Sequence, residues 1–358
     1  MTPFRFGIIG SGEIAGFYMD HFTRRADKQG VEFVGACDIA QDRVKSFAAK
    51  YGGQAYTDAR KFLRRKDLDA VVVLTLPPWH AELARKALRA GKHVLTEKPL
   101  GLKLSDALSA VRLARKNNLK LACSPFIILG DAQQKVKRYL ADGAIGQPLV
   151  ITADQYHGRI ETWKKDAGNF YRLSGGPVLD VGPYPLTLMI DWLGRVKAVR
   201  SLCATVLPRR RDFEGKNFQI DVYDQATLLL EFECGAVGRV DISNANFRSD
   251  LHGMEIHGSK GSIALSALMD FNAQIKLSNS DEGKWQVVEG DPSPKPASGV
   301  DWSTGIMELA AAVREDRQPR NSGELALHVL QVLLAGMKAS KLGRRVPTPD
   351  LLADKPTA

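Results

Sequence analysis

Apolar residues in the first third of the chain gather into short runs that longer amphipathic stretches separate. The runs resemble strands that a parallel sheet buries on both faces, and the stretches carry apolar residues at the helical period. The predicted strands are residues 4–9, 31–37, 70–76, 94–96 and 120–123, and the predicted helices run to about residue 28 and over 41–51, 80–90 and 105–117. We therefore predict an α/β domain over residues 1–124, with a doubly wound parallel sheet of the Rossmann type.

The pattern changes after Pro125. A predicted helix at 131–142 precedes a strand at 148–157, and residues 163–174 are polar and aromatic, which predicts a loop. After a helix that ends at Leu193, apolar residues alternate with period two, as in antiparallel or mixed sheets. The strands predicted there are 196–206, 218–232, 236–243, 251–257, 262–266 and 273–277.

Residues 125–358 are therefore predicted to form an α+β domain with a large, mostly antiparallel open sheet. Its last helices, within 302–340, are predicted to pack back on the first domain. Residues 291–296 are rich in proline and predict an exposed loop, and the tail from Pro347 predicts a frayed end.

Composition is that of a soluble globular protein, with 44% apolar and 25% charged residues in 358. No apolar run approaches the ~18 residues of a membrane span, and no leader precedes the first strand, so we expect a cytoplasmic protein with no membrane partner. The net charge is +10, with short basic runs at 61–66, which Phe62-Leu63 interrupts, and at 209–211, and no recognised nucleic-acid motif surrounds them. They predict solvated surface rather than nucleic-acid binding. The positive electrostatic potential of the protein would favour the binding of an anionic cofactor or an acidic substrate.

The four cysteines, Cys37, Cys123, Cys203 and Cys234, are widely scattered. They form no Cys-x-x-Cys motif and have no adjacent histidine. This spacing predicts buried, reduced thiols and neither a metal site nor a disulfide framework.

A glycine-rich loop follows the first predicted strand and reads Gly10-Ser11-Gly12-Glu13-Ile14-Ala15. Gly10 suits a tight turn, Gly12 lets a pyrophosphate approach the backbone, and Ala15 lets the next helix pack closely on the strand. The helix start also offers amides to phosphates. Because the loop lies between a strand and a helix, it predicts a dinucleotide site.

Asp38 ends the second predicted strand, where an acid accepts hydrogen bonds from the ribose hydroxyls of a dinucleotide. An acid there repels a 2′-phosphate, which favours NAD over NADP. Arg43 is near enough to keep NADP as an alternative. Asp38 also suits an N-cap for the helix at 41–51, a role compatible with ribose binding.

A charged pair closes the strand at 94–96, in the sequence Glu97-Lys98-Pro99. Ligands of open α/β sheets bind at the carboxyl ends of the strands. A lysine held partly out of water can handle protons, because burial moves its pKa toward neutrality. The plain alternative is a surface ion pair, with Glu97 holding the strand end in place.

Several motifs occur together in one order, and through them the chain resembles the Gfo/Idh/MocA oxidoreductases. The motifs are the loop at 10–15, Pro77-Pro78-Trp79-His80, Ala90-Gly91-Lys92-His93-Val94, Glu97-Lys98-Pro99, the segment 175–194 and Ser322-Gly323-Glu324-Leu325-Ala326-Leu327-His328. The resemblance implies an NAD(P)-binding domain followed by a domain for substrate binding and oligomerisation. It also implies a homodimer or homotetramer that pairs through the C-terminal sheet.

The resemblance implies that Lys98 is the active-site lysine and that Asp180 holds a substrate hydroxyl. Tyr184 stands where many members have histidine, which places the chain with the tyrosine branch that includes glucose-fructose oxidoreductase and dihydrodiol dehydrogenase. A lysine ammonium beside a tyrosine favours the phenolate and suits acid–base catalysis. As alternatives, Asp180 could cap the following helix and Tyr184 could serve packing.

The remaining implied site residues form two groups. The cofactor group comprises Gly10, Ser11, Gly12, Glu13, Ile14, Ala15, Asp38, Arg43, Leu76, Pro77, His80, Glu97 and Lys98. The substrate group comprises Lys98, Asp180 and Tyr184 with His157, Trp163 and Tyr171, which are equally compatible with packing. His93 is expected to be structural or close to the cofactor rather than catalytic, and His328 is expected to lie in the core.

The implied activity is that of an NAD(P)-dependent dehydrogenase or reductase of a sugar or sugar-like polyol. Two alternatives are a glycosidase that uses NAD for transient oxidation, and a cofactor-binding sensor without turnover. Family membership does not identify the sugar, the reacting carbon, the direction of the reaction or whether the cofactor leaves after each turnover.

Overall fold

The computed structural model describes residues 2–279, 283–289 and 299–353, which fall into two compact units. Unit 1 is residues 1–126 with 301–327, and unit 2 is residues 127–300 with 328–358. The chain thus changes unit after Phe126, two residues beyond the predicted boundary. The proline-rich loop predicted at 291–296 lies outside the described residues.

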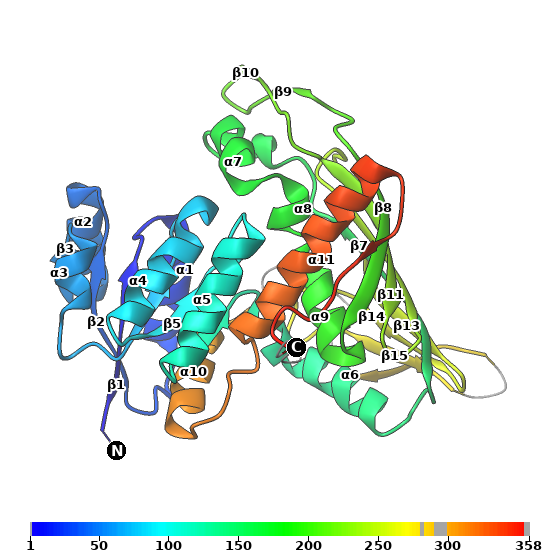
Figure 1. Cartoon of the computed structure of the whole chain (residues 1–358), viewed down its shortest axis with the longest axis horizontal. Helices are drawn as coiled ribbons and strands as arrows, with labels where there is room; N and C mark the ends of the chain where they lie inside the picture. The colour runs from blue at the N-terminus through cyan, green and yellow to red at the C-terminus, as the bar shows by residue number, and fades with distance from the viewer. Residues whose placement is uncertain (1, 280–282, 290–298, 354–358) are drawn as a thin grey trace, which may run out of the picture. The chain divides into compact units, whose positions relative to one another are not determined.

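Unit 1 is built on a six-stranded sheet in which every strand pairs in parallel with its neighbours (Figure 1). In their order across the sheet, the strands are β3 (Gln54–Tyr56), β2 (Val31–Cys37), β1 (Phe4–Ile9), β4 (Ala70–Val73), β5 (His93–Thr96) and β6 (Leu121–Cys123). Phe6, Ile8 and Val72 are fully buried at its centre. This confirms the predicted Rossmann-type sheet.

Helices alternate with these strands along the chain. They are α1 (Glu13–Arg24), α2 (Gln41–Tyr51), α3 (Ala59–Leu63), the 3₁₀ turn η1 (Pro77–Trp79), α4 (His80–Arg89) and α5 (Leu104–Lys116). The sequence pattern missed β3 and α3. Both are short, and β3 is a largely exposed edge strand with almost no apolar signal.

The chain returns to unit 1 through α10 (Thr304–Arg314). Arg25 pairs with Asp301, and Trp302 packs on the rings of Phe17 and Tyr18 in α1. The second closing helix, α11 (Gly323–Leu342), belongs to unit 1 only up to Leu327. The return to the first unit is therefore shorter than the predicted span 302–340.

Unit 2 is built on a nine-stranded sheet that is antiparallel except between β7 and β12. Its strands, in order, are β16 (Gln286–Glu289), β15 (Ile275–Ser278), β14 (Ser262–Leu265), β13 (His252–Gly258), β7 (Pro148–Tyr156), β12 (Val237–Ser243), β11 (Gln225–Phe232), β8 (Val196–Ala204) and β17 (Val346–Pro347). The predicted large, mostly antiparallel sheet is confirmed.

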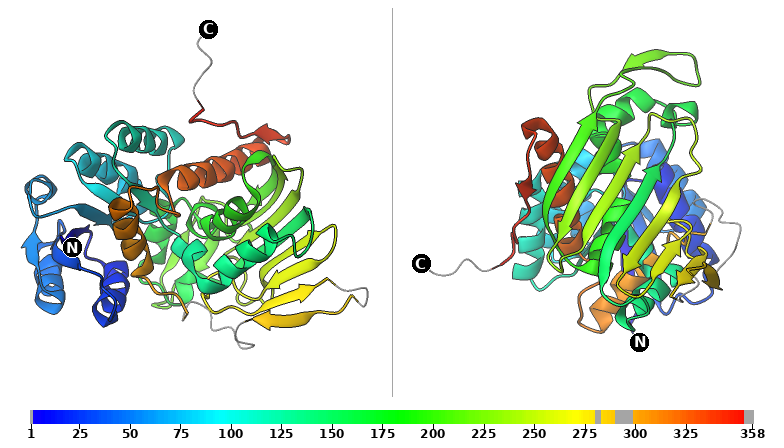
Figure 2. Two further views of the ribbon diagram at one scale, coloured as in Figure 1. Left: turned by 90° about the horizontal axis from the view of Figure 1, so that it is seen from below. Right: turned by 90° about the vertical axis from the view of Figure 1, so that its right-hand side faces the viewer.

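The helices α6 (Asp131–Ala141), α8 (Pro177–Asp180) and α9 (Pro183–Leu193), together with α11 from His328 onward, pack on one face of this sheet, and the right-hand view in Figure 2 shows the other face open. The shorter elements η2 (Phe126–Leu129), η3 (Ile160–Thr162) and α7 (Ala167–Ser174) complete the described helical elements between β6 and β8. His328 is buried in the core, as expected.

Three local predictions in unit 2 were wrong. Residues 163–174 are not a loop throughout, because α7 begins at Ala167. The single strand predicted at 218–232 is two strands, β10 (Asn217–Gln219), which pairs with β9 (Arg209–Arg211), and β11. The tail is paired rather than frayed at its start, where Pro347 lies against β8 and Thr348 is buried.

Three of the four free cysteines, Cys37, Cys123 and Cys203, are buried as predicted. Burial raises the pKa of the Cys37 thiol to about 12, which leaves it protonated and unreactive at neutral pH. Cys234 differs, because it lies exposed in the turn between β11 and β12.

The helix α11 is long and apolar enough, by length and composition, to cross a membrane. The sequence pattern had predicted no apolar run of that length. Of its most apolar 18-residue window, 56% is buried inside the structure, as in the core helix of a soluble protein.

Candidate active site

The predicted cofactor-binding residues follow the carboxyl ends of four neighbouring strands in unit 1. Asp38 follows β2, residues 10–15 follow β1, residues 76–80 follow β4, and Glu97 with Lys98 follows β5. In a doubly wound sheet, ligands bind at this edge where the strand order reverses, here between β1 and β4. The fold therefore brings the predicted cofactor residues to one edge.

The glycine loop has the shape that a dinucleotide needs. Gly10 has a φ of +96°, and a Cβ added there would lie 2.7 Å from the carbonyl oxygen of Leu74. A Cβ added at Gly12 would meet nothing within 4 Å. Since α1 begins at Glu13, open space lies directly before the helix amides, where a pyrophosphate would be held.

Asp38 is fixed at the tip of β2 by several hydrogen bonds. Its carboxylate accepts from the backbone N–H of Ser11 (2.8 Å) and of Ala40 (2.9 Å). Arg43 donates through Nε (3.1 Å) and Nη2 (2.8 Å). Burial favours the neutral acid, but these donors outweigh it and lower the pKa of Asp38 below its usual value, so the group is a carboxylate at neutral pH.

The pairing of Arg43 with Asp38 bears on the choice of cofactor. The Arg43 side chain is 50% exposed, and it shares the acid expected to bind the ribose. The site therefore presents a negative and a positive group side by side.

The segment after β4 includes an exposed Leu76 and a buried Pro77. His80 is also buried, with Nδ1 2.8 Å from the carbonyl oxygen of Pro99 and Nε2 2.9 Å from that of Thr75. Burial lowers the pKa of His80, against the effect of the two carbonyls. Its ring joins the ends of β4 and β5, which is a structural position, and its contact with a cofactor stays a prediction.

Glu97 anchors the end of β5. The hydroxyl of Tyr18 donates to its Oε1 (2.6 Å), and the backbone N–H of Lys98 donates to its Oε2 (3.0 Å). The same hydroxyl lies 2.9 Å from Ser124 Oγ, just after β6. Tyr18 of α1 therefore links Glu97 to the end of β6. Glu97 thus holds the strand end as expected, and the half-buried Lys98 extends from this fixed point.

Asp180 and Tyr184 lie on either side of a tight turn in unit 2. Asp180 is the last residue of α8, and Tyr184 is the second residue of α9 and is 9% exposed. A Cβ at Gly182 would lie 2.3 Å from the carbonyl oxygen of Val178, so the turn requires glycine. The N-cap residue of α9 is Gly182, two residues after Asp180.

The other predicted substrate residues are also in unit 2. His157 and Trp163 are exposed, with ring centroids 6.4 Å apart. Tyr171 is 1% exposed and hydrogen-bonds to Glu161 and Arg210. That position is one of packing, whereas His157 and Trp163 are accessible, and their contact with substrate stays a prediction.

Asn246 was not singled out in the sequence. Both atoms of its side-chain amide are buried without a hydrogen-bond partner among the described residues. Such atoms are rare in folded proteins, and they make Asn246 a further candidate to bind a polar group. An asparagine in a loop belongs to no motif, so the sequence offered no signal.

Comparisons with known proteins agree with this geometry. Residues 4–124 match the model of the oxidoreductase family with an NAD-binding Rossmann fold, and residues 133–264 match the GFO/IDH/MocA C-terminal domain. A dTDP-3,4-didehydro-2,6-dideoxy-alpha-D-glucose 3-reductase of Saccharopolyspora spinosa is 34% identical, over 74% of each chain. The chain belongs to the Gfo/Idh/MocA oxidoreductase family.

Other members of the family match nearly the whole chain. A D-apiose dehydrogenase of Paraburkholderia graminis is 27% identical over 99% of this chain and 92% of its own. The solved structure of a levoglucosan dehydrogenase in complex with NADH and L-sorbose covers 98% of this chain and all of its own. Its TM-score is 0.85 at 20% identity, so it supports the fold alone.

Proposed function

We propose that this Gfo/Idh/MocA protein is an NAD-dependent dehydrogenase or reductase that acts on a sugar or related polyol. The observation that carries the proposal is the ionised Asp38 carboxylate beside the open space at Gly12. Relatives named D-apiose dehydrogenase, 1,5-anhydro-D-fructose reductase and levoglucosan dehydrogenase support the substrate class.

The preference for NAD rests on charge. Asp38 accepts hydrogen bonds from ribose hydroxyls, and its charge repels a 2′-phosphate. Arg43 offsets this repulsion only in part, because both of its hydrogen bonds go to Asp38. NADP is therefore a weaker alternative that Arg43 supports.

The chemistry is assigned to three side chains. When bound, the nicotinamide takes or gives the hydride at a carbinol or carbonyl carbon. In the proposal, Asp180 orients the reacting hydroxyl, Tyr184 exchanges the hydroxyl proton, and Lys98 stabilises the tyrosine oxygen as it becomes negative. Glu97 and Tyr18 keep Lys98 in place through the end of β5.

The open face of the unit 2 sheet supports the expected homo-oligomer. Leu202, Leu229 and Val237 lie on one face of β8, β11 and β12 and are 72%, 49% and 50% exposed. A second copy that covered this face would bury these apolar side chains. A cytoplasmic location is part of the same proposal.

One experiment tests the activity. The purified protein is denatured and the released cofactor is identified by mass and absorbance. The protein is then incubated with NAD⁺ or NADP⁺ and a panel of aldoses, ketoses, inositols and glycosides, and absorbance at 340 nm is recorded. NAD⁺-dependent reduction with a sugar or polyol supports the proposal. Aglycone release from a glycoside without net NADH, or no turnover with any substrate, contradicts it.

A further inference from the structure

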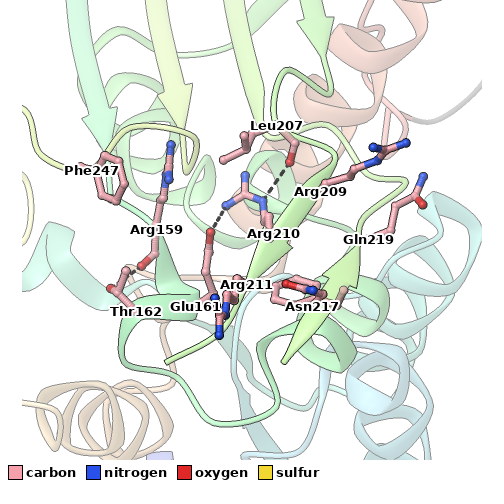
Figure 3. Close-up of a pocket in the computed structure, with 11 residues that line it drawn as sticks. Arg159, Glu161, Thr162, Leu207, Arg209, Arg210, Arg211, Asn217, Gln219 and Phe247 are labelled. Carbon is pink, nitrogen blue, oxygen red and sulfur yellow. Dashed lines mark hydrogen bonds and ion pairs between the residues drawn. The ribbon is translucent and has the colours of Figure 1, made fainter. Parts of the chain in front are cut away.

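A pocket of about 770 Å³ lies within unit 2 and is lined by no residue assigned above to the cofactor or to catalysis, although the predicted substrate residues His157 and Trp163 flank its segment 159–162 (Figure 3). It is formed by the turn after β7, the strands β9 and β10, and Phe247. Its volume is in the range of small-molecule sites in proteins, which is about 300–1,000 Å³. The lining residues are Arg159, Glu161, Thr162, Leu207, Arg209, Arg210, Arg211, Asn217, Phe218, Gln219 and Phe247.

A buried ion network builds one wall of this pocket. The side chain of Arg210 is 0% exposed, and its Nη1 donates to Glu161 (2.7 Å) while its Nη2 donates to Asp224 (2.7 Å). Tyr171 donates to the second oxygen of Glu161 (3.1 Å), and the backbone amides of Val206 and Leu207 donate to Asp224. Both carboxylates thus find their hydrogen-bond partners inside the protein. Through these bonds Glu161 and Asp224 hold β9 and the residues just before it in place.

The other three arginines of the pocket differ from Arg210. Arg209 and Arg211 alternate with it along β9 and are exposed, whereas Arg210 is buried. Arg159 is held by a hydrogen bond from Nε to the carbonyl oxygen of Ala245 (3.0 Å), and its guanidinium lies 3.7 Å from the centroid of the Phe247 ring. Stacking and a backbone bond thus orient Arg159 without neutralising it.

No carboxylate lies within 4.0 Å of the guanidinium groups of Arg159, Arg209 or Arg211 in the described parts of the chain. The pocket network thus has four arginines, Arg159, Arg209, Arg210 and Arg211, and two carboxylates, Glu161 and Asp224. The net charge of these six side chains is +2. In the view of Figure 3, Arg159 and Arg209 lie on either side of the neutralised Arg210. Arginine favours carboxylate and phosphate oxygens because its planar fork can donate two parallel hydrogen bonds.

We propose that this pocket binds a small anionic molecule through a carboxylate or phosphate group, with Arg159, Arg209 and Arg211 as the binding residues. Leu207 and Phe218 supply apolar walls, and Asn217 and Gln219 supply amides for further polar groups of the ligand. The proposal is independent of the proposed sugar oxidation, because it concerns binding alone.

Isothermal titration calorimetry of the full-length protein tests the proposal. Excess NAD⁺ is present so that the glycine loop of unit 1 is occupied, and malonate and inorganic phosphate are titrated in separate experiments. We expect saturable binding of at least one anion, which weakens as KCl is raised because salt screens exposed charges. Binding of malonate alone identifies a carboxylate ligand, and binding of phosphate alone identifies a phosphate ligand.

Variants locate the binding. Arg209→Ala/Arg211→Ala should weaken it about tenfold or more, because the anion loses charge-assisted hydrogen bonds from two arginines. Arg159→Ala, which leaves β9 intact, should weaken it similarly and replaces the double variant if that variant fails to fold. Arg200→Ala removes an exposed arginine of β8 outside the pocket and should leave binding unchanged. The proposal is wrong if neither anion binds saturably, or if both pocket variants bind as tightly as the wild type.

Discussion

Asp38 receives two backbone hydrogen bonds and a bidentate pair from Arg43. The acid is therefore held in one position by the loop of β1 and by its own helix α2. A carboxylate held in this way can accept hydrogen bonds from ribose hydroxyls without first being ordered, which lowers the entropic cost of binding.

Substitution of these two residues should change cofactor preference in opposite directions. Asp38→Ser removes the repulsion of a 2′-phosphate and leaves Arg43 without its partner, so KM for NAD⁺ should rise about tenfold or more while KM for NADP⁺ falls. Arg43→Ala should weaken NADP⁺ use and leave NAD⁺ use nearly unchanged. Steady-state kinetics with both cofactors measures the ratio of KM for NAD⁺ to KM for NADP⁺ in each variant. An unchanged ratio in Asp38→Ser would contradict the assignment of Asp38 to the ribose.

Sequence reasoning at this scale predicted the conformation of residues whose surroundings are local, whereas their cofactor contacts stay predictions. The glycine loop and Asp38 are recognisable because the turn, the helix start and the strand tip are adjacent in the chain. Tyr18 and Glu97 are 79 residues apart, and Arg210 and Glu161 are 49 apart. Neither pair belongs to a local pattern, so only the folded structure reveals them.

The β1–α1 loop allows folding and cofactor binding to be tested separately. Gly10→Ala should destabilise the protein by about 1–2 kcal/mol or more, because its φ is positive and the new Cβ meets the Leu74 backbone. Gly12→Ala adds a Cβ into open space at an ordinary φ of −78°, so the protein should fold normally but bind NAD⁺ weakly. Thermal unfolding and NAD⁺ titration check the pair. Normal NAD⁺ affinity in Gly12→Ala would exclude the loop as the pyrophosphate site.

The β9 strand offers a similar comparison for the buried network. Arg210→Met leaves Glu161 and Asp224 buried without a cation, which should lower the free energy of unfolding by about 3–5 kcal/mol. Arg211→Met, one residue along and exposed, should change it by less than about 0.5 kcal/mol. Urea denaturation measures both values, and equal effects would contradict the role of Arg210.

Element prediction failed where long-range contacts override the local pattern. Residues 218–232 alternate as one strand would, yet Asp224 is buried and accepts hydrogen bonds from residues 206, 207 and 210. The chain turns there and forms the β9–β10 hairpin instead. The helix α7 begins after Asp166, whose backbone φ is +52°. The surrounding residues are polar and aromatic, so no helical period of apolar residues marks this helix in the sequence.

At the scale of the molecule, the buried His328 should make stability depend on pH. It accepts a hydrogen bond from the Val196 N–H (3.0 Å), and burial lowers its pKa to about 4. The unfolded chain takes up this proton below pH ~6.5, whereas the folded protein does so only near pH 4. Stability is thus complete above pH ~6.5 and falls as the pH drops toward 4, by about 2 kcal/mol at pH 5.

Urea denaturation at pH 7.5 and pH 5 measures this effect. His328→Gln has no titrating group at this position, so its stability should fall less between the two pH values than that of the wild type. An identical fall in both proteins would show that His328 does not contribute.

The two units contributed unequally to what could be predicted. The alternation of strands and helices in unit 1 is local, so its sheet, and the edge that carries the predicted cofactor residues, followed from the sequence. The antiparallel sheet of unit 2 was predicted in outline, but its arginine-lined pocket was not. That pocket depends on the hairpin at 209–219 meeting residues 159–162 and Phe247, which are distant in the chain.

The most direct test of the central claim is the turnover of Lys98→Met with NAD⁺ and the best sugar substrate, recorded at 340 nm. Lys92→Met, at the opposite end of the same strand segment, is the control, and NAD⁺ binding to each variant is measured alongside. We predict that Lys98→Met retains its fold but loses about 10²-fold or more in kcat at saturating NAD⁺, while Lys92→Met keeps near wild-type activity. Near wild-type turnover in Lys98→Met would contradict the account.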